Sequence, residues 1–134
     1  MMTLLRHLRE DYSILITDDD ESCRSCLKDI FEPEGYVTYL ASCGREAVEI
    51  AKQKFLHLLI LDVHLPDFSG FDTFEFIKEE KKFLMPCIFV TADTSKELKM
   101  GAIAANAYTL ISKPINKEMI KYAVEQSLEK FYWK

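Results

Sequence analysis

Polar residues follow four short apolar runs of this chain, at the point where each run ends. They are Asp18 with Asp19, then Asp62, Thr91 and Lys113. Runs of Val, Ile, Leu and Phe predict buried strands, which are apolar on both sides in a parallel sheet covered by helices. Because the carboxyl ends of parallel strands meet at one edge, where open α/β folds bind ligands, we expect these residues to converge. Three carboxylates, a hydroxyl and a lysine there predict a site for a divalent metal ion and a phosphoryl group.

The apolar spacing alternates between the strand period and the helix period five times. Strands are predicted at residues 14–16, 37–41, 58–61, 87–90 and 108–111. Helices are predicted around residues 23–31, 47–51, 71–77, 94–105 and 117–131, with Pro33 and Gly35 ending the first. Right-handed crossovers then give an α/β fold, a five-stranded parallel sheet in the flavodoxin-like order 2-1-3-4-5 with helices on both faces. We expect one domain over residues 1–134, in which residues 1–10 are an N-terminal extension.

Length and charge narrow the function classes. A chain of 134 residues fits one domain. Folding buries roughly two-thirds of the surface that the unfolded chain exposes, so the domain needs no disulfide or metal to be stable. The net charge of -5 argues against nucleic acid as a direct partner, which would need a basic face. No apolar run approaches the ~20 residues of a membrane span, and no signal peptide is visible, so no membrane association and a cytoplasmic location are expected.

The four cysteines, Cys23, Cys26, Cys43 and Cys87, include one Cys-x-x-Cys pair. Such a pair can be redox-active when positive surroundings lower the thiol pKa, but here the acidic residues 18–21 stand directly upstream. A zinc site would need a second pair of ligands, which the sequence does not offer. We therefore predict that Cys23 and Cys26 are small buried side chains on a helix face, with protonated thiols.

The predicted strand order brings the carboxylates together, because the first and third strands flank the point where that order reverses. Three close carboxylates repel one another, so a cation is expected among them. Mg²⁺ suits this site because it takes carboxylates, waters and phosphate oxygens, and Lys113 adds a second positive charge. This set suits phosphoryl transfer to an aspartate, which is catalysed mainly by positioning and electrostatic stabilisation.

Several neighbouring polar residues have simpler roles. Asp20 and Glu21 are expected at a helix N-terminus, where the helix dipole favours acidic residues. Asp67 is expected to support a turn. The side chain of His64, taken alone, is expected in an exposed loop.

At this point a family resemblance is evident. The segments that carry it are Ile-Leu-Ile-Thr-Asp18-Asp19-Asp20-Glu21, Leu-Ile-Leu-Asp62-Val-His-Leu-Pro66-Asp-Phe-Ser-Gly70, Val-Thr91-Ala92 and Ser-Lys113-Pro114. In this order and at this spacing they resemble the receiver domain of the two-component response regulators over nearly the whole chain. The resemblance implies a domain that takes a phosphoryl group from a sensor histidine kinase or a histidine phosphotransfer protein and then switches a surface that binds a downstream protein target. It also implies self-catalysed phosphorylation from phosphodonors, self-catalysed dephosphorylation and, in some members, a homodimer.

The resemblance also assigns roles to residues. Asp62 would be the phosphoacceptor, and Thr91, the Ala92 amide and Lys113 would contact the phosphoryl oxygens. The Mg²⁺ ion would be held by Asp19 directly, Asp18 through water, Asp62, and the backbone carbonyl of His64. The Lys113–Pro114 peptide bond is expected to be cis.

Two positions depart from the family pattern. Three residues before Lys113 the family usually has Tyr or Phe, whose rotation reports the movement of Thr91, but this chain has Leu110. A switch through Thr91 and Leu110 is therefore expected to be weak. Asn106 stands where glycine is common, and Asn tolerates left-handed backbone angles better than most residues.

The sequence leaves other readings open. The chain could be a single-domain regulator, a phosphorelay intermediate, or a receiver fragment of a longer regulator with a separate effector domain. A pseudo-receiver that only binds partners would be expected to lose some of Asp19, Asp62 or Lys113, and all are present. A flavin enzyme of the same architecture would need a phosphate-binding loop where residues 18–21 are acidic.

Overall fold

The strands form one parallel sheet in the computed structural model, which describes residues 12–81, 84–93 and 95–132. The strands are β1 (Ser13–Thr17), β2 (Val37–Ala41), β3 (Leu58–Asp62), β4 (Cys87–Thr91) and β5 (Thr109–Ser112). Their order, β2-β1-β3-β4-β5, confirms the predicted topology. The predicted fifth strand is shifted by one residue, because pairing with β4 begins at Thr109 opposite Ile88 and leaves Tyr108 in the preceding bend. The predicted N-terminal extension, residues 1–10, lies outside the described residues.

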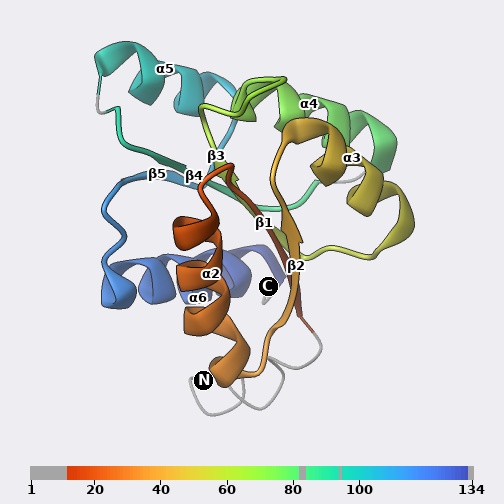
Figure 1. The fold of residues 1–134 in the computed structure, drawn as a ribbon, viewed down its shortest axis with the longest axis vertical. Coiled ribbons are helices and arrows are strands. Elements are labelled where there is room, and N and C mark those ends of the chain that lie inside the picture. The colour runs from red at the N-terminus through yellow and green to blue at the C-terminus, as the bar shows by residue number, and fades with distance from the viewer. Residues whose placement is uncertain (1–11, 82–83, 94, 133–134) are drawn as a thin grey trace.

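Helices cover both faces of this sheet (Figure 1). They are α2 (Glu21–Phe31), followed by the 3₁₀ turn η2 (Glu32–Glu34), α3 (Gly44–Gln53), α4 (Gly70–Lys81), α5 (Lys96–Ala104) and α6 (Lys117–Tyr132). In Figure 1, α2 and α6 lie below the sheet, and α3, α4 and α5 lie above it. Among the described residues, no helix is long and apolar enough to cross a membrane.

Local signals set the ends of several elements. The side chain of Asp20 accepts a hydrogen bond from the amide of Ser22 at 2.9 Å, so Asp20 is the N-cap of α2, as predicted. Ser95 caps α5 in the same way. Asn106 has a φ of 60°, which confirms the left-handed turn before β5. The Lys113–Pro114 peptide bond is cis, as expected.

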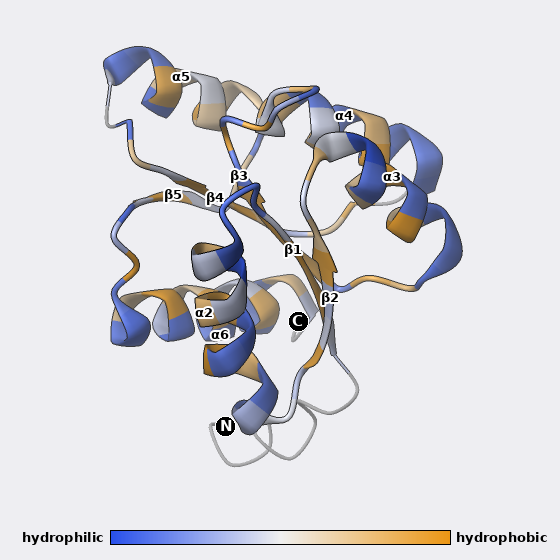
Figure 2. Cartoon of the chain, in the orientation of Figure 1, coloured by the Kyte–Doolittle hydropathy of each residue, from blue (hydrophilic) through white to orange (hydrophobic). Residues whose placement is uncertain are grey.

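The core has two halves because successive strand residues point to opposite faces. Ile14, Ile16 and Ile60 pack under α2 and α6. Leu15 and Phe89 pack under α3, α4 and α5. Figure 2 shows the matching pattern, with apolar strands and helices that are polar on their outer sides. This double burial explains the apolar runs, and it leaves the polar residues at the strand ends.

One prediction on α2 was wrong in part. The buried face of this helix carries Leu27, Ile30 and Phe31, but Cys26 is exposed and Cys23 is only partly buried. Cys26 stands three residues after Cys23, and this spacing predicts that both lie on the apolar face. The buried stripe of the helix is narrower than the spacing predicts. Neither cysteine forms a disulfide.

Candidate functional site

Two carboxylates meet at the carboxyl edge of the sheet because β1 and β3 are hydrogen-bonded neighbours. Thr17 pairs with Leu61, so Asp18, directly after β1, lies beside Asp62, the last residue of β3. Both residues are buried, whereas Asp19 is exposed. Carboxylate oxygens of Asp18, Asp19 and Asp62 all lie within 4.8 Å of one another.

Lys113 supplies the positive charge of this cluster. Its Nζ lies 2.9 Å from Oδ2 of Asp18 and 2.9 Å from Oδ2 of Asp62. Its backbone amide donates to the carbonyl of Thr91 at 2.8 Å, which fixes the start of the β5–α6 segment next to the end of β4. The lysine therefore reaches across β4 to bridge two acidic residues at the ends of β1 and β3.

Burial and charge pull the pKa values of the two bridged carboxyl groups apart. Desolvation opposes ionisation of Asp18, but Lys113 and the amide of Asp20 outweigh it and lower the pKa of Asp18. Desolvation dominates at Asp62, and the charge of Asp18 adds to it, so the pKa of Asp62 is raised despite Lys113. The two carboxylates raise the pKa of Lys113, against its own desolvation. Burial, more than charge, therefore sets the direction at Asp62.

Backbone amides orient the same two carboxylates. Oδ1 of Asp18 accepts from the amide of Asp20 at 2.9 Å, and Oδ1 of Asp62 accepts from the amide of His64 at 3.0 Å. Sequence reasoning missed one supporting group, Arg24, whose guanidinium donates to the backbone carbonyl of Asp18 at 2.7 Å. The only sequence signal for this contact is the position of Arg24 in the first turn of α2, shortly after the acidic residues 18–21.

The remaining predicted residues, apart from Leu110, lie at or just after the ends of β3 and β4. Thr91 ends β4, next to β3, and is fully buried, and its hydroxyl accepts from the amide of Asp93 at 3.0 Å. Ala92 follows it and is exposed. The side chain of His64 is exposed, as expected, and its Nε2 lies 3.7 Å from a carboxylate oxygen of Asp93. Leu110 is half-buried on β5 and packs toward α3, α4 and α5, away from the carboxylates.

Comparison with known proteins identifies the family. The family model described as the response regulator receiver domain matches residues 14–125. This chain belongs to that family. Transcriptional regulatory protein YvrH of Bacillus subtilis is 32% identical over 124 residues, which cover 92% of this chain and 52% of YvrH. Polar-differentiation response regulator DivK of Brucella ovis is 32% identical over 107 residues, covering 78% of this chain and 85% of DivK.

Solved structures agree with this membership. The CheY-like response regulator receiver domain protein of Methanospirillum hungatei superposes with a TM-score of 0.83 at 29% identity, covering 89% of this chain and 94% of that one. This receiver domain therefore spans nearly all of some relatives but about half the length of YvrH. Receiver domains act in two-component signalling as phosphoryl-accepting modules, and that is the class of this chain.

The acidic cluster of the receiver domain fits a magnesium ion. Receiver domains generally bind Mg²⁺ at an acidic pocket, and here three residues offer carboxylate oxygens within 4.8 Å of one another. Hard oxygen donors with open positions for water are what Mg²⁺ prefers. These three carboxylates face a single lysine, Lys113, which bridges two of them. The donor set thus has the chemistry and the excess charge that a divalent cation would compensate.

Cys23 touches this site as well. Desolvation and the neighbouring Asp18 carboxylate, to which the thiol donates, raise the pKa of Cys23 to about 12. The thiol is therefore protonated near neutral pH, as the acidic run predicted. Cys23 supports Asp18 rather than offering a thiolate.

Asp67 supports the predicted turn and also binds the first amides of α3. Its carboxylate accepts from the amides of Gly44 and Arg45 at 2.8 Å each, as well as from Phe68 at 2.7 Å. Asp67 therefore caps α3 from a loop more than 20 residues away in sequence. Desolvation opposes ionisation, but the amides of Arg45, Phe68 and Gly44 lower the pKa of Asp67 to about 2.

We expect Asp67→Ala to lower the free energy of unfolding by about 1 kcal/mol at pH 7, as the loss of an N-cap does. Because the folded pKa lies below the ordinary 3.8, this stabilisation is present above that pH and is lost as the pH falls through about 2. Urea denaturation at pH 7 and pH 3 measures it, with the exposed Asp72→Ala as control. A difference between wild type and Asp67→Ala that grows at low pH would contradict the capping role.

Proposed function

We propose that Asp62 of this receiver domain accepts a phosphoryl group from a phosphohistidine of a sensor kinase or a histidine phosphotransfer protein, in a reaction that requires Mg²⁺. The observation that carries the proposal is the contact of Lys113 with both Asp18 and Asp62, at 2.9 Å each, inside a cluster of three carboxylates. Asp62 is buried and amide-oriented, which suits a nucleophile held in one position.

In the proposed step, a carboxylate oxygen of Asp62 attacks the phosphorus. A P–O bond forms while the P–N bond to the donor histidine breaks, and the departing imidazole takes up a proton. Lys113 stabilises the negative charge on the phosphoryl oxygens, together with the Thr91 hydroxyl and the Ala92 amide at the end of β4. When bound, Mg²⁺ supplies further positive charge to these oxygens.

We assign the metal to Asp19 directly, to Asp18 through water, to Asp62 and to the backbone carbonyl of His64. The same residues would serve self-catalysed dephosphorylation, in which water attacks the aspartyl phosphate. A cytoplasmic location, a downstream protein target and a homodimer belong to this proposal too. So does an effector outside these residues, since YvrH is about twice as long as the part matched here. Neither a pseudo-receiver nor a flavin enzyme accounts for an acidic cluster bridged by lysine.

Incubation with phosphoramidate is expected to add one phosphoryl mass to the wild type in Mg²⁺ and none in chelator. Asp62→Asn should gain none in either buffer, because an amide oxygen is a poor nucleophile and leaves no stable product. Intact-mass spectrometry measures both. A phosphoryl mass on Asp62→Asn, or equal gain in chelator, would overturn the proposal.

We also propose that the switch through Thr91 and Leu110 is weak. Leu110 has no hydroxyl to exchange between buried and exposed partners, and a ligand shifts an equilibrium only by its differential affinity for the two states. Tyr108, in the bend before β5, is the aromatic residue nearest to Leu110 in sequence. It is 37% exposed, and the Nζ of Lys130 lies 5.9 Å from its ring centre.

Backbone NMR with beryllofluoride, a phosphoryl mimic, is expected to shift the amides of Asp62, Thr91 and Lys113 strongly and those of residues 108–111 and 117–122 weakly. Amide shifts on β5 and α6 as large as that of Thr91 would show that the switch works without the Tyr or Phe ring that the family usually has at the position of Leu110. Tyr108→Ala then tests whether Tyr108 replaces it.

A further inference from the structure

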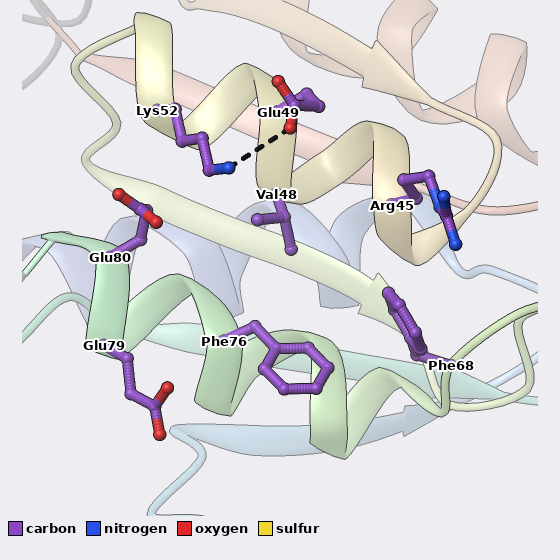
Figure 3. A pocket seen from close by; sticks show the side chains of 8 residues that line it. All are labelled: Arg45, Val48, Glu49, Lys52, Phe68, Phe76, Glu79 and Glu80. Carbon is purple, nitrogen blue, oxygen red and sulfur yellow. Dashed lines mark hydrogen bonds and ion pairs between the residues drawn. The ribbon is translucent and has the colours of Figure 1, made fainter.

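A groove of about 650 Å³ lies between α3 and α4, two neighbouring helices that cover the same face of the sheet (Figure 3). The floor of the groove is apolar, with Val48 from α3 and Phe68 and Phe76 from the β3–α4 loop and α4. Phe76 is 41% exposed, and its ring meets that of Phe68 edge to face at 5.1 Å. Two aromatic rings thus line an open hollow that nothing else in the described chain fills.

The two ends of this groove carry opposite charge. Glu79 and Glu80 stand at the C-terminal end of α4, where the helix dipole adds partial negative charge. Arg45 stands at the other end, beside Phe68 (Figure 3). None of these three side chains forms an ion pair with another described residue, whereas Glu49 on the rim is paired with Lys52 at 3.3 Å. Within the described part of the chain, the groove therefore presents unpaired acid and unpaired base on either side of an apolar floor.

The length of the groove fits a helix rather than a small molecule. Arg45 and Lys52 lie seven residues apart on α3, which corresponds to roughly 10 Å along the axis, or two helical turns. An amphipathic helix of two or three turns can place apolar residues on Phe76 and Val48 and a cation on the glutamates. A small anion would meet the glutamates, and a symmetric dimer through this face would set one hollow against another.

We propose that this α3–α4 groove binds an amphipathic helical segment of a partner protein, with an apolar stripe on Phe68 and Phe76 and a lysine or arginine against Glu79 and Glu80. The proposal does not depend on phosphorylation. The groove does border the phosphorylation site's loop, because Phe68 follows Asp67, whose carboxylate binds the amides of Gly44 and Arg45. A segment bound there would contact the loop that leaves β3 after Asp62.

The test uses a designed helical peptide of about 15 residues, with leucines at i, i+3, i+4 and i+7, lysines at one end and glutamates at the other. A matched control peptide has glutamate in place of each lysine. Titration into the ¹⁵N-labelled full chain is expected to shift the amides of α3, α4 and the β3–α4 loop. The control peptide should bind about tenfold more weakly or worse.

Variants of the exposed groove residues sharpen this result. Phe76→Ala should weaken binding of the lysine peptide at least about tenfold, whereas Ile103→Ala, equally apolar and 75% exposed on α5, should not. Glu79→Lys combined with Glu80→Lys should weaken the lysine peptide and strengthen the glutamate peptide. Thermal melts confirm that each variant is folded.

The following outcomes would overturn the proposal. They are no amide shifts in the groove at millimolar lysine peptide, shifts confined to another face, or equal binding of both peptides. Groove shifts that depend on protein concentration without any peptide would assign the groove to a second copy of the chain instead.

Discussion

Lys113→Met is expected to lower the free energy of unfolding by about 2–3 kcal/mol in metal-free buffer. The Nζ of Lys113 lies 2.9 Å from both Asp18 and Asp62, and Asp18 is fully buried. Removing one partner of a buried ion pair leaves the other charge without compensation, which costs more than the pair itself contributes. Methionine keeps most of the side-chain volume, so the loss reports charge rather than packing.

Magnesium should reverse much of this loss, because a divalent ion in the same cluster supplies the missing positive charge. Urea denaturation with chelator and with Mg²⁺ measures the effect, and Mg²⁺ should stabilise Lys113→Met more than the wild type. Lys96→Met, at an exposed position on α5, is the control and should change little in either buffer. An equal loss in both buffers would mean that the cation does not bind among these carboxylates.

Gly70→Ala is expected to lower the free energy of unfolding by about 3 kcal/mol and to abolish phosphoryl gain at Asp62. A Cβ at residue 70 would overlap the carbonyl oxygen of Asp62 and lie 3.0 Å from the Cα of Val63. These are backbone atoms of the segment that carries Asp62, and the amide of Gly70 also donates to the carbonyl of Val63 at 2.7 Å. Because the added Cβ meets backbone atoms, no side chain can rotate away to make room. The backbone of Asp62 must therefore move.

Gly101→Ala is the matched control for this substitution. A Cβ there would meet ring atoms of Phe71 at 2.9 Å, and this half-buried ring can rotate away. Alanine also gains about 1 kcal/mol of helix preference over glycine inside α5. We expect near-wild-type stability and full phosphoryl gain. Chemical denaturation and mass spectrometry test both variants, and a Gly70→Ala protein as stable and reactive as Gly101→Ala would contradict the account.

The sheet and the centre of the site followed from the sequence because each depends on a local pattern. Doubly buried strands are apolar throughout, so the polar residue that ends such a run stands out, as Asp18 and Asp62 do. Parallel topology then places these ends at one edge without further information. The convergence of Lys113 on both carboxylates is a consequence of this arrangement.

Contacts between distant segments could not be predicted in the same way. Asp67 caps α3 across 22 residues, and a Pro/Gly-punctuated loop gives no signal of which helix it will meet. Arg24, near the start of α2, donates to the backbone carbonyl of Asp18. An arginine at such a position usually predicts only a solvent-exposed helix face, so the sequence did not predict this contact. The exposure of Cys26 depended on the width of the buried stripe of α2, which is set by packing against β1, β2 and α6 rather than by spacing.

The identity of the phosphorylated side chain is the most direct test of the central claim. Aspartyl phosphates are reduced by borohydride to homoserine, which marks the acceptor in a peptide map. After phosphorylation in Mg²⁺, reduction and proteolysis, mass spectrometry should find homoserine at position 62 and unmodified aspartate at 18, 19 and 67. Homoserine at any of these other positions, or none at position 62 in a sample that carries the phosphoryl mass, would contradict the account.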